Sequence, residues 1–421
     1  MKKPILFGFL VFICQLSLNA QGLTVETCQE KAKANYPLVK QYGLIEQTSH
    51  YNLSNANKGY LPQLTLSARA TYQSQVTELP ISLPNIVIPS LTKDQYQAVL
   101  EASQVIWDGG VIEAQKKIAI AGTEVEKQKL EIDLFALNER VNQLYFGILL
   151  LNQQIKQNDI LQNELLTNFK RVTAYMQNGI ANQSDLDAIK VEQLNAIQRE
   201  TELKGTQKSY FIMLSALTGL AIQEQTPLTK PEINLSSVKD TTSQRPELKM
   251  FDAQNMLYES QKGLLNAGNL PKVGLFLQGG YGKPGLNMLT NAFSPFYVGG
   301  LRMSWNFSAL YSQKNNINKI DLSKKTVDIQ KETFLFNSDL KTKQQRSEIE
   351  KLQNQISNDD EIIRLRENIK KAATAKLDNG TLTVSDLIRE INSEDQAKQV
   401  KSLHEIQLMM SVYQLKNNLN N

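Results

Sequence analysis

The sequence predicts a mainly α-helical chain with a smaller β component, built as a tandem repeat of one unit. Three observations support this: a repeated segment, two pairs of alternating strands, and two long proline-free helical stretches. The repeated segment reads QNGIANQSDL at 177–186 and DNGTLTVSDL at 378–387, an offset of 201 residues. A period near 200 residues is too long for a solenoid of short repeats. The chain is therefore expected to hold two copies of one large unit.

The repeat continues outside this segment. At the same offset, Leu100 and Ser103 match Leu301 and Ser304, while further upstream the offset is 209 and Leu61-Pro62 matches Leu270-Pro271. The eight extra residues fall in the proline-rich loop ELPISLPNIVIPS at 78–90. We expect a first repeat at 21–235 and a second at 236–421. Each has a helix, two strands, a long helix, a tip turn and a returning helix.

Two strand pairs alternate between apolar and polar residues, as in QLTLSARATY at 63–72. The predicted apolar face, which would face lipid in a membrane, consists of Leu64, Leu66, Ala68, Val273, Leu275, Leu277, Leu301 and Met303. The predicted opposite face holds Thr65, Ser67, Arg69, Arg302 and Ser304. The second strand of the first copy alternates less regularly. On strands alone, this pattern fits either a half-buried soluble sheet or a membrane barrel.

Long helices favour the membrane interpretation. No proline occurs from Asp108 to Gln177, which predicts one helix of about 100 Å. Its coiled-coil seam runs through Leu130, Leu134, Leu137, Val141, Leu144, Ile148, Leu151 and Ile155. The second long stretch, 309–377, shows a seam at Ile349, Leu352 and Ile356. Shorter helical stretches at 23–58 and 184–217 would together run beside the first long helix. A compact soluble domain has no use for helices of this length.

The repeated segment has the residues of a helical hairpin tip. Gly179 and Gly380 stand where a left-handed C-terminal cap is needed. Asn182 with Asp185, and Thr383 with Asp386, have the spacing of capping boxes for the returning helices. Leu186 and Leu387 would begin the apolar stripe of those helices. We expect the tips at the end of the long helices away from the strands. A well-capped turn explains most of this pattern, but not why it is built twice.

Residues 1–20 have the layout of a secretory signal peptide. Lys2 and Lys3 precede an apolar stretch at 5–18, and Ala20 offers a cleavage site before Gln21. No small residue precedes Cys14 where a lipoprotein cleavage would need one. The remaining chain has a net charge near +2, which does not suggest a nucleic-acid surface. It keeps one cysteine, Cys28, so no disulfide framework is expected.

The sequence gives no support for an enzyme, a metal site or a cofactor. His50 and His404 lie in polar helical stretches without ligand spacing, and no nucleophile elbow or phosphate loop occurs. We interpret the histidines as solvated or as contacts between helices. The rival to a channel is a periplasmic coiled-coil adaptor or structural protein without a channel. Such a protein would not need two strand pairs placed symmetrically against two long helices.

The tandem repeat, the Leu-Pro entries at 61–62 and 270–271, WDGG at 107–110 and the two NG…SDL tips resemble the TolC family of outer-membrane efflux channels. This resemblance covers nearly all of the chain after residue 20. It implies a homotrimer in the outer membrane, whose subunits each give four strands to one β-barrel, with a helical tunnel in the periplasm. It further implies the exit channel of a tripartite efflux or type I secretion system. The partners would be a periplasmic membrane fusion (adaptor) protein and, through it, an inner-membrane pump of the RND or ABC type.

Physical reasoning reaches part of this independently. Four strands cannot close a barrel, and open strand edges are not tolerated in lipid, so strands in a membrane must be shared among subunits. Two, three or four copies would all satisfy this condition, and only the resemblance selects three.

The resemblance also implies site residues at the periplasmic end. The residues expected to contact the adaptor are Asn178, Gly179, Ser184, Asp185, Leu186, Asn379, Gly380, Ser385, Asp386 and Leu387. Asp386 and Arg389 are expected at the tunnel mouth. The chain departs from the family pattern at two gate positions, where Leu382 replaces an arginine and Arg389 an acidic residue. The second strand-to-helix joint reads Ala309-Leu310-Tyr311 in place of glycines, so we expect a different corner there.

Overall fold

The structure, a computed structural model, describes residues 22–77, 90–232 and 244–419. The predicted signal peptide, nearly all of the 78–90 loop and the predicted repeat boundary at 235/236 lie outside the described residues. The chain divides into two units. The sheet unit lies within residues 38–133 and 244–339, and the hairpin unit within residues 1–37, 134–243 and 340–421. Each unit thus draws on both halves of the sequence.

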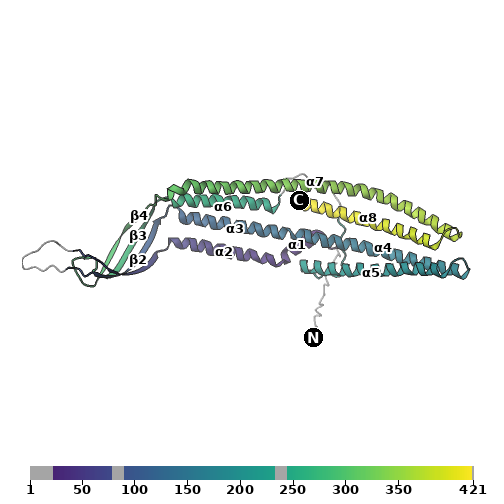
Figure 1. Cartoon of the computed structure of the whole chain (residues 1–421), viewed down its shortest axis with the longest axis horizontal. Helices are drawn as coiled ribbons and strands as arrows, with labels where there is room; N and C mark the ends of the chain where they lie inside the picture. The colour runs from purple at the N-terminus through teal and green to yellow at the C-terminus, as the bar shows by residue number, and fades with distance from the viewer. Residues whose placement is uncertain (1–21, 78–89, 233–243, 420–421) are drawn as a thin grey trace, which may run out of the picture. The chain divides into compact units, whose positions relative to one another are not determined.

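The sheet unit is built around an antiparallel sheet with the strand order β1-β2-β3-β4. The strands are β1 (Gln63–Tyr72), β2 (Asp94–Trp107), β3 (Lys272–Lys283) and β4 (Ser294–Ser304). The helices before and after the strand pairs are α2 (Gln41–Asn57), α3 (Val111–Phe135), α6 (Pro246–Gly268) and the first part of α7 (Ala309–Asp378) (Figure 1). Short 3-10 helices, Pro37–Lys40 and Lys58–Tyr60, flank α2. The order helix, strand, strand, helix therefore occurs twice, as the sequence predicts.

The corner from β2 into α3 depends on Asp108 and two glycines. The Asp108 carboxylate accepts hydrogen bonds from the backbone N–H groups of Gly110 (2.8 Å) and Ile112 (2.7 Å), which caps the helix. Gly109 has a φ of +76°, and a Cβ there would lie 2.8 Å from the Ala267 carbonyl oxygen. Only glycine meets both demands. The second corner differs, as expected: the Asn306 side chain accepts from the Ser308 backbone N–H at 3.1 Å.

The hairpin unit contains two helical hairpins. Its helices are α1 (Val25–Asn35), α4 (Leu137–Gln177), α5 (Gln183–Thr218), the second part of α7 and α8 (Val384–Leu419). Helix α4 packs along α5 and against α8, and α1 packs on α4 and α5. A parallel bridge between Leu23 and Leu228 joins the start of the described chain to the segment after α5.

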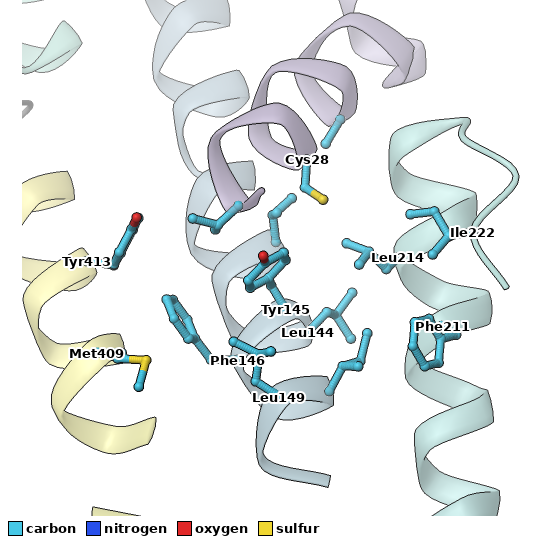
Figure 2. Close-up of a cluster of buried hydrophobic side chains, with 14 of the residues drawn as sticks. Cys28, Leu144, Tyr145, Phe146, Leu149, Phe211, Leu214, Ile222, Met409 and Tyr413 are labelled. Atoms are coloured by element: carbon cyan, nitrogen blue, oxygen red, sulfur yellow. The ribbon is translucent and has the colours of Figure 1, made fainter. Parts of the chain in front are cut away.

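The largest apolar cluster of the hairpin unit is centred on α4. Tyr145 and Phe146 are fully buried there, between Cys28 of α1, Phe211 of α5 and Tyr413 of α8 (Figure 2). The Tyr145 hydroxyl lies 2.6 Å from the carbonyl oxygens of Leu23 and Thr229, within reach as a donor. Helix α4 is thereby in contact with α1, α5, α8 and the segment after α5 that contains Thr229. A second cluster, around Leu352 and Val412, packs α7 against α8.

The predicted seam is buried, but the predicted helix is interrupted. Seven of its eight residues are less than 9% exposed, and Ile155 is half-buried. The prediction of one helix from Asp108 to Gln177 is wrong, because α3 ends at Phe135 and α4 begins at Leu137. Ala136 keeps an α-helical backbone (φ −62°, ψ −19°), and the interruption lies close to where the chain passes from the sheet unit to the hairpin unit. Helix α7 runs for 70 residues without a break.

Over the described ranges, no helix combines the length and apolar character needed to cross a bilayer.

The reactivity of the Cys28 thiol provides a test of the packing of the hairpin unit. Burial, with a smaller contribution from Glu26, raises the pKa of the Cys28 thiol to about 12. Because the thiolate is the species that reacts, almost no reactive form exists at about pH 8. We expect iodoacetamide to leave Cys28 unmodified in the folded protein and to alkylate it after denaturation, as measured by mass spectrometry. Rapid alkylation of the folded protein would contradict the buried position of α1.

Candidate functional site: a two-faced sheet and two hairpin tips

One face of the sheet is apolar. The register pairs Leu66 with Leu100 and Leu275 with Leu301, and side chains alternate between faces along each strand. All eight residues predicted to face lipid therefore share one face. They are Leu64, Leu66, Ala68, Val273, Leu275, Leu277, Leu301 and Met303. The proposal that they contact lipid is developed below.

This apolar face is exposed in the isolated chain. Leu66 is 75% and Leu301 70% exposed. The face also carries Tyr281, as alternation along the third strand predicts. Leu100 and Tyr297 lie on it too, and sequence reasoning did not assign these two. Leu100 was missed because β2 alternates imperfectly: Val99 lies on the polar face and Gln104 on the apolar face. A contiguous exposed apolar face of this kind needs a partner or a lipid surface to cover it.

The opposite face is polar, and it holds all five residues predicted there: Thr65, Ser67, Arg69, Arg302 and Ser304. Along β2 and β3, its side chains are more covered than those of the apolar face.

The centre of the polar face holds an ion pair that the sequence did not reveal. The Glu101 carboxylate accepts from Arg302 Nη1 at 2.7 Å and from Gln278 Nε2 at 2.5 Å. The Arg302 guanidinium lies 4.5 Å from the centre of the Phe276 ring, close enough for a cation–π contact. Glu101 and Arg302 occupy equivalent positions of the two repeats, at the offset of 201. The offset of 201 indicates that Glu101 and Arg302 are equivalent positions. It does not indicate that their side chains meet across β3, because that depends on the order of the strands in the sheet.

The sheet is open at both sides. Among the described residues, β1 pairs only with β2, and β4 pairs only with β3. Each outer strand therefore presents backbone N–H and C=O groups that a further strand would satisfy.

The first tip, between α4 and α5, has the predicted caps. Gly179 has a φ of +73°, and its N–H donates to the Met176 carbonyl at 3.0 Å. Asn182 and Asp185 form the predicted capping box, in which each side chain accepts from the backbone N–H of the other. Ser184 adds a hydrogen bond to the Asn182 side chain at 2.7 Å.

The second tip, between α7 and α8, repeats this geometry. Gly380 has a φ of +68°, and its N–H donates to the Leu377 carbonyl at 2.9 Å. The Thr383 hydroxyl accepts from the Asp386 N–H at 3.1 Å and donates to the Asp386 carboxylate at 2.7 Å. Asn178 and Asn379, one in each tip, donate from their side chains to the carbonyl four residues back, both at 2.8 Å. The two repeated segments therefore form closely similar turns, which differ in that the Asp386 carboxylate accepts from a hydroxyl and the Asp185 carboxylate from a backbone N–H.

The two tips share one apolar core, and this corrects part of the predicted contact surface. The core consists of Leu161, Leu165, Val172, Leu186, Ile189, Ala196, Ala373, Leu377, Val384, Leu387 and Ile391. Leu186 (7% exposed) and Leu387 (2% exposed), which were predicted to contact an adaptor, pack in this core, so little of either side chain lies on the surface. The Tyr175 hydroxyl donates to the Asp378 carboxylate at 2.5 Å, which joins the tips side by side.

Exposed polar groups remain at the tips. Asn178, Gly179, Ser184, Asn379, Gly380 and Ser385 are exposed, and Asp185 and Asp386 are half-buried. Arg389 lies 3.2 Å from the Asp386 carboxylate, at the predicted spacing of one helical turn. The Thr383 hydroxyl and the Arg389 guanidinium hold the pKa of Asp386 below its usual value. Leu382 packs against the shared core.

The histidine in α8 joins two helices. His404 Nδ1 lies 2.6 Å from the carboxylate of Asp359 in α7, which agrees with a contact between helices. Within the described residues, no three histidine, cysteine or acidic side chains gather as metal ligands would.

Part of the chain matches a known protein family. A family model for outer membrane efflux proteins matches residues 29–220, which lie inside the predicted first repeat. No curated protein sequence matches the chain.

Solved structures of outer-membrane channels share the fold. Structures of CusC, which describe its folding and transmembrane channel formation, match with a TM-score of 0.70 and 14% identity, over 94% of this chain and 91% of that one. The outer membrane protein VceC of Vibrio cholerae matches with a TM-score of 0.66 and 14% identity, over 94% of each chain. The MtrE outer membrane channel of Neisseria gonorrhoeae matches with a TM-score of 0.64 and 14% identity, over 94% and 89%. The predicted fold class is confirmed.

The tips depend on a glycine in the left-handed region, which gives a direct test. A β-branched residue at Gly380 would strain the backbone by about 1–2 kcal/mol, whereas asparagine tolerates this conformation. We expect Gly380→Val to speed amide hydrogen exchange in residues 377–387, and the matched variant Gly380→Asn to change it little. Equal exchange in both variants would show that the turn does not require the positive φ.

Proposed function

Since a family model for outer membrane efflux proteins matches residues 29–220, we propose that the chain is an outer-membrane exit channel that conducts solutes passively. The observation that carries this proposal is the sheet, which has a broad exposed apolar face, a more covered polar face and two open edges. In lipid, backbone groups find no water, so an open sheet edge must be paired by another strand. Pairing β4 of one copy with β1 of the next closes a barrel with the apolar face toward lipid and the polar face toward a lumen.

The number of copies follows the family resemblance. We propose a homotrimer, in which each subunit supplies four strands to one barrel and its helices to a tunnel in the periplasm. In a trimer the lumen and the outer surface are each assembled from three equivalent sheets. A coiled-coil adaptor without a channel would leave the apolar face uncovered. The signal peptide predicted at 1–20 would deliver the chain to the periplasm for insertion into the outer membrane.

The tips are proposed to meet a periplasmic adaptor protein. Three subunits with two tips each would present six near-equivalent turns around the tunnel mouth. Each turn carries a capping aspartate, Asp185 or Asp386, at the positive end of a helix, and Ile180 is exposed beside the first of them. Leu186 and Leu387 would support these turns from the core. The adaptor would couple the channel to an inner-membrane pump of the RND or ABC type, which selects the cargo.

The oligomer is the first test of this proposal. We expect the protein extracted in mild detergent to have the protein mass of about three chains by multi-angle light scattering, because isolated subunits would expose open strand edges to lipid. It should also stay with the membrane fraction after a high-salt wash. A monodisperse monomer, or release of the protein without detergent, would refute the shared barrel and favour a soluble adaptor.

An arginine introduced on the apolar face of the sheet is expected to have a different effect from an arginine introduced on the polar face. Leu275→Arg places a charge on the apolar face, which costs about 2–4 kcal/mol near the middle of a membrane. Ser304→Arg places the same side chain on the polar face. We expect the first variant to reduce trimer yield in the outer membrane and the second to assemble normally with altered conductance. The reverse result would mean that the lipid and lumen faces are exchanged.

A further inference from the structure

The polar face of the sheet carries an excess of positive charge. Its charged residues along the four strands are Arg69, Glu101, Lys272 and Arg302. Glu101 is engaged by Arg302, so this pair contributes little net charge. Arg69 and Lys272 remain without an acidic counterpart among the strand residues of that face. Counted over the four described strands, this face of each chain therefore has a net charge of about +2.

Arg69 lies in a recess of that face. The register places it beside Gln97, toward the end of the sheet that carries the β3–β4 loop. A cavity of about 170 Å³ is lined on the sheet side by Arg69, Thr71, Gln95 and Gln97, and on the loop side by Pro284, Gly285, Leu286 and Met288. Tyr96 and Lys283 complete its lining, so it contains no carboxylate.

The β3–β4 loop is held over this part of the sheet. At this end of the sheet, the Thr92 hydroxyl donates to the Asn291 side chain at 3.1 Å. On the apolar face, Phe293 of the loop stacks on Tyr281 with ring centres 5.6 Å apart. Loop residues Leu286 and Met288, both more than 60% exposed, also line the Arg69 cavity. In a closed barrel, three such loops would narrow the lumen at the level of Arg69.

We propose that Arg69 is a selectivity residue, and that the barrel segment of the channel attracts anionic solutes and disfavours cationic ones. The inference rests on the proposed channel function and assigns a substrate charge class to it. Rings of charged side chains set ion preference where a pore is narrow. One unit charge at about 6 Å in water changes the local concentration of a monovalent ion about threefold, and salt screens this effect at longer range. Three copies of Arg69 around a narrowed lumen would act together.

The test is the reversal potential of single trimers in a planar bilayer under a potassium chloride gradient. We expect the chloride-to-potassium permeability ratio to fall about twofold to threefold in Arg69→Gln and further in Arg69→Glu, while Arg69→Lys keeps the wild-type ratio. The matched control is the double variant Glu101→Gln/Arg302→Gln. It removes two charged groups from the same face without changing its net charge, so the ratio should stay at the wild-type value.

The outcomes separate this inference from the proposed function. Open channels with the same permeability ratio in wild type, Arg69→Gln and Arg69→Glu would overturn the role of Arg69 and leave the channel intact. A change in the double variant as large as that in Arg69→Gln would also overturn it, because net charge would then not be the cause. Trimers that form no conducting pore would refute the channel itself, and the inference with it.

Discussion

The backbone groups along the outer edges of β1 and β4 are the constraint on which the other features depend. A sheet with an apolar face can lie in lipid only if every N–H and C=O group is bonded, and this sheet leaves two strand edges open among its described residues. Sharing strands between copies satisfies those groups without adding chain length. Pairing these edges would also close the sheet into a barrel, in which the polar face becomes the wall of a lumen.

The two repeats of the sequence do not correspond to the two structural units. The sequence repeats as two halves, yet each compact unit takes segments from both halves. The sheet shows why this works: equivalent strand pairs, β1–β2 and β3–β4, lie next to each other and place equivalent leucines on one face. At equivalent positions in the centre, the repeats have diverged to opposite charges, Glu101 and Arg302, which now bind each other. Divergence after duplication thus produced a contact that identical copies could not make.

The two tips have diverged much less. Their glycine N–H groups, asparagine side chains and aspartate N–H groups keep the same hydrogen bonds, whereas the neighbouring exposed positions differ, as with Ile180 and Thr381. Backbone geometry is what the repeated residues preserve. Leu186 and Leu387, which match between the two repeats, are buried in one shared core and therefore have a packing role. The polar caps are the part of the tip that stays on the surface.

The sequence by itself determined the features that depend on neighbours in the chain. Alternation along 63–72 assigned Leu66 and Arg69 to opposite faces, and the glycine and capping residues fixed both tips, because side-chain period and helix capping are local properties. Only the tertiary structure decided what depends on distant partners. The Glu101–Arg302 pair requires the strand order, the break at Ala136 occurs near the passage between the two units, and the burial of Leu387 requires two hairpins to share a core. Such contacts join residues more than 200 positions apart, and no local pattern records which of them meet.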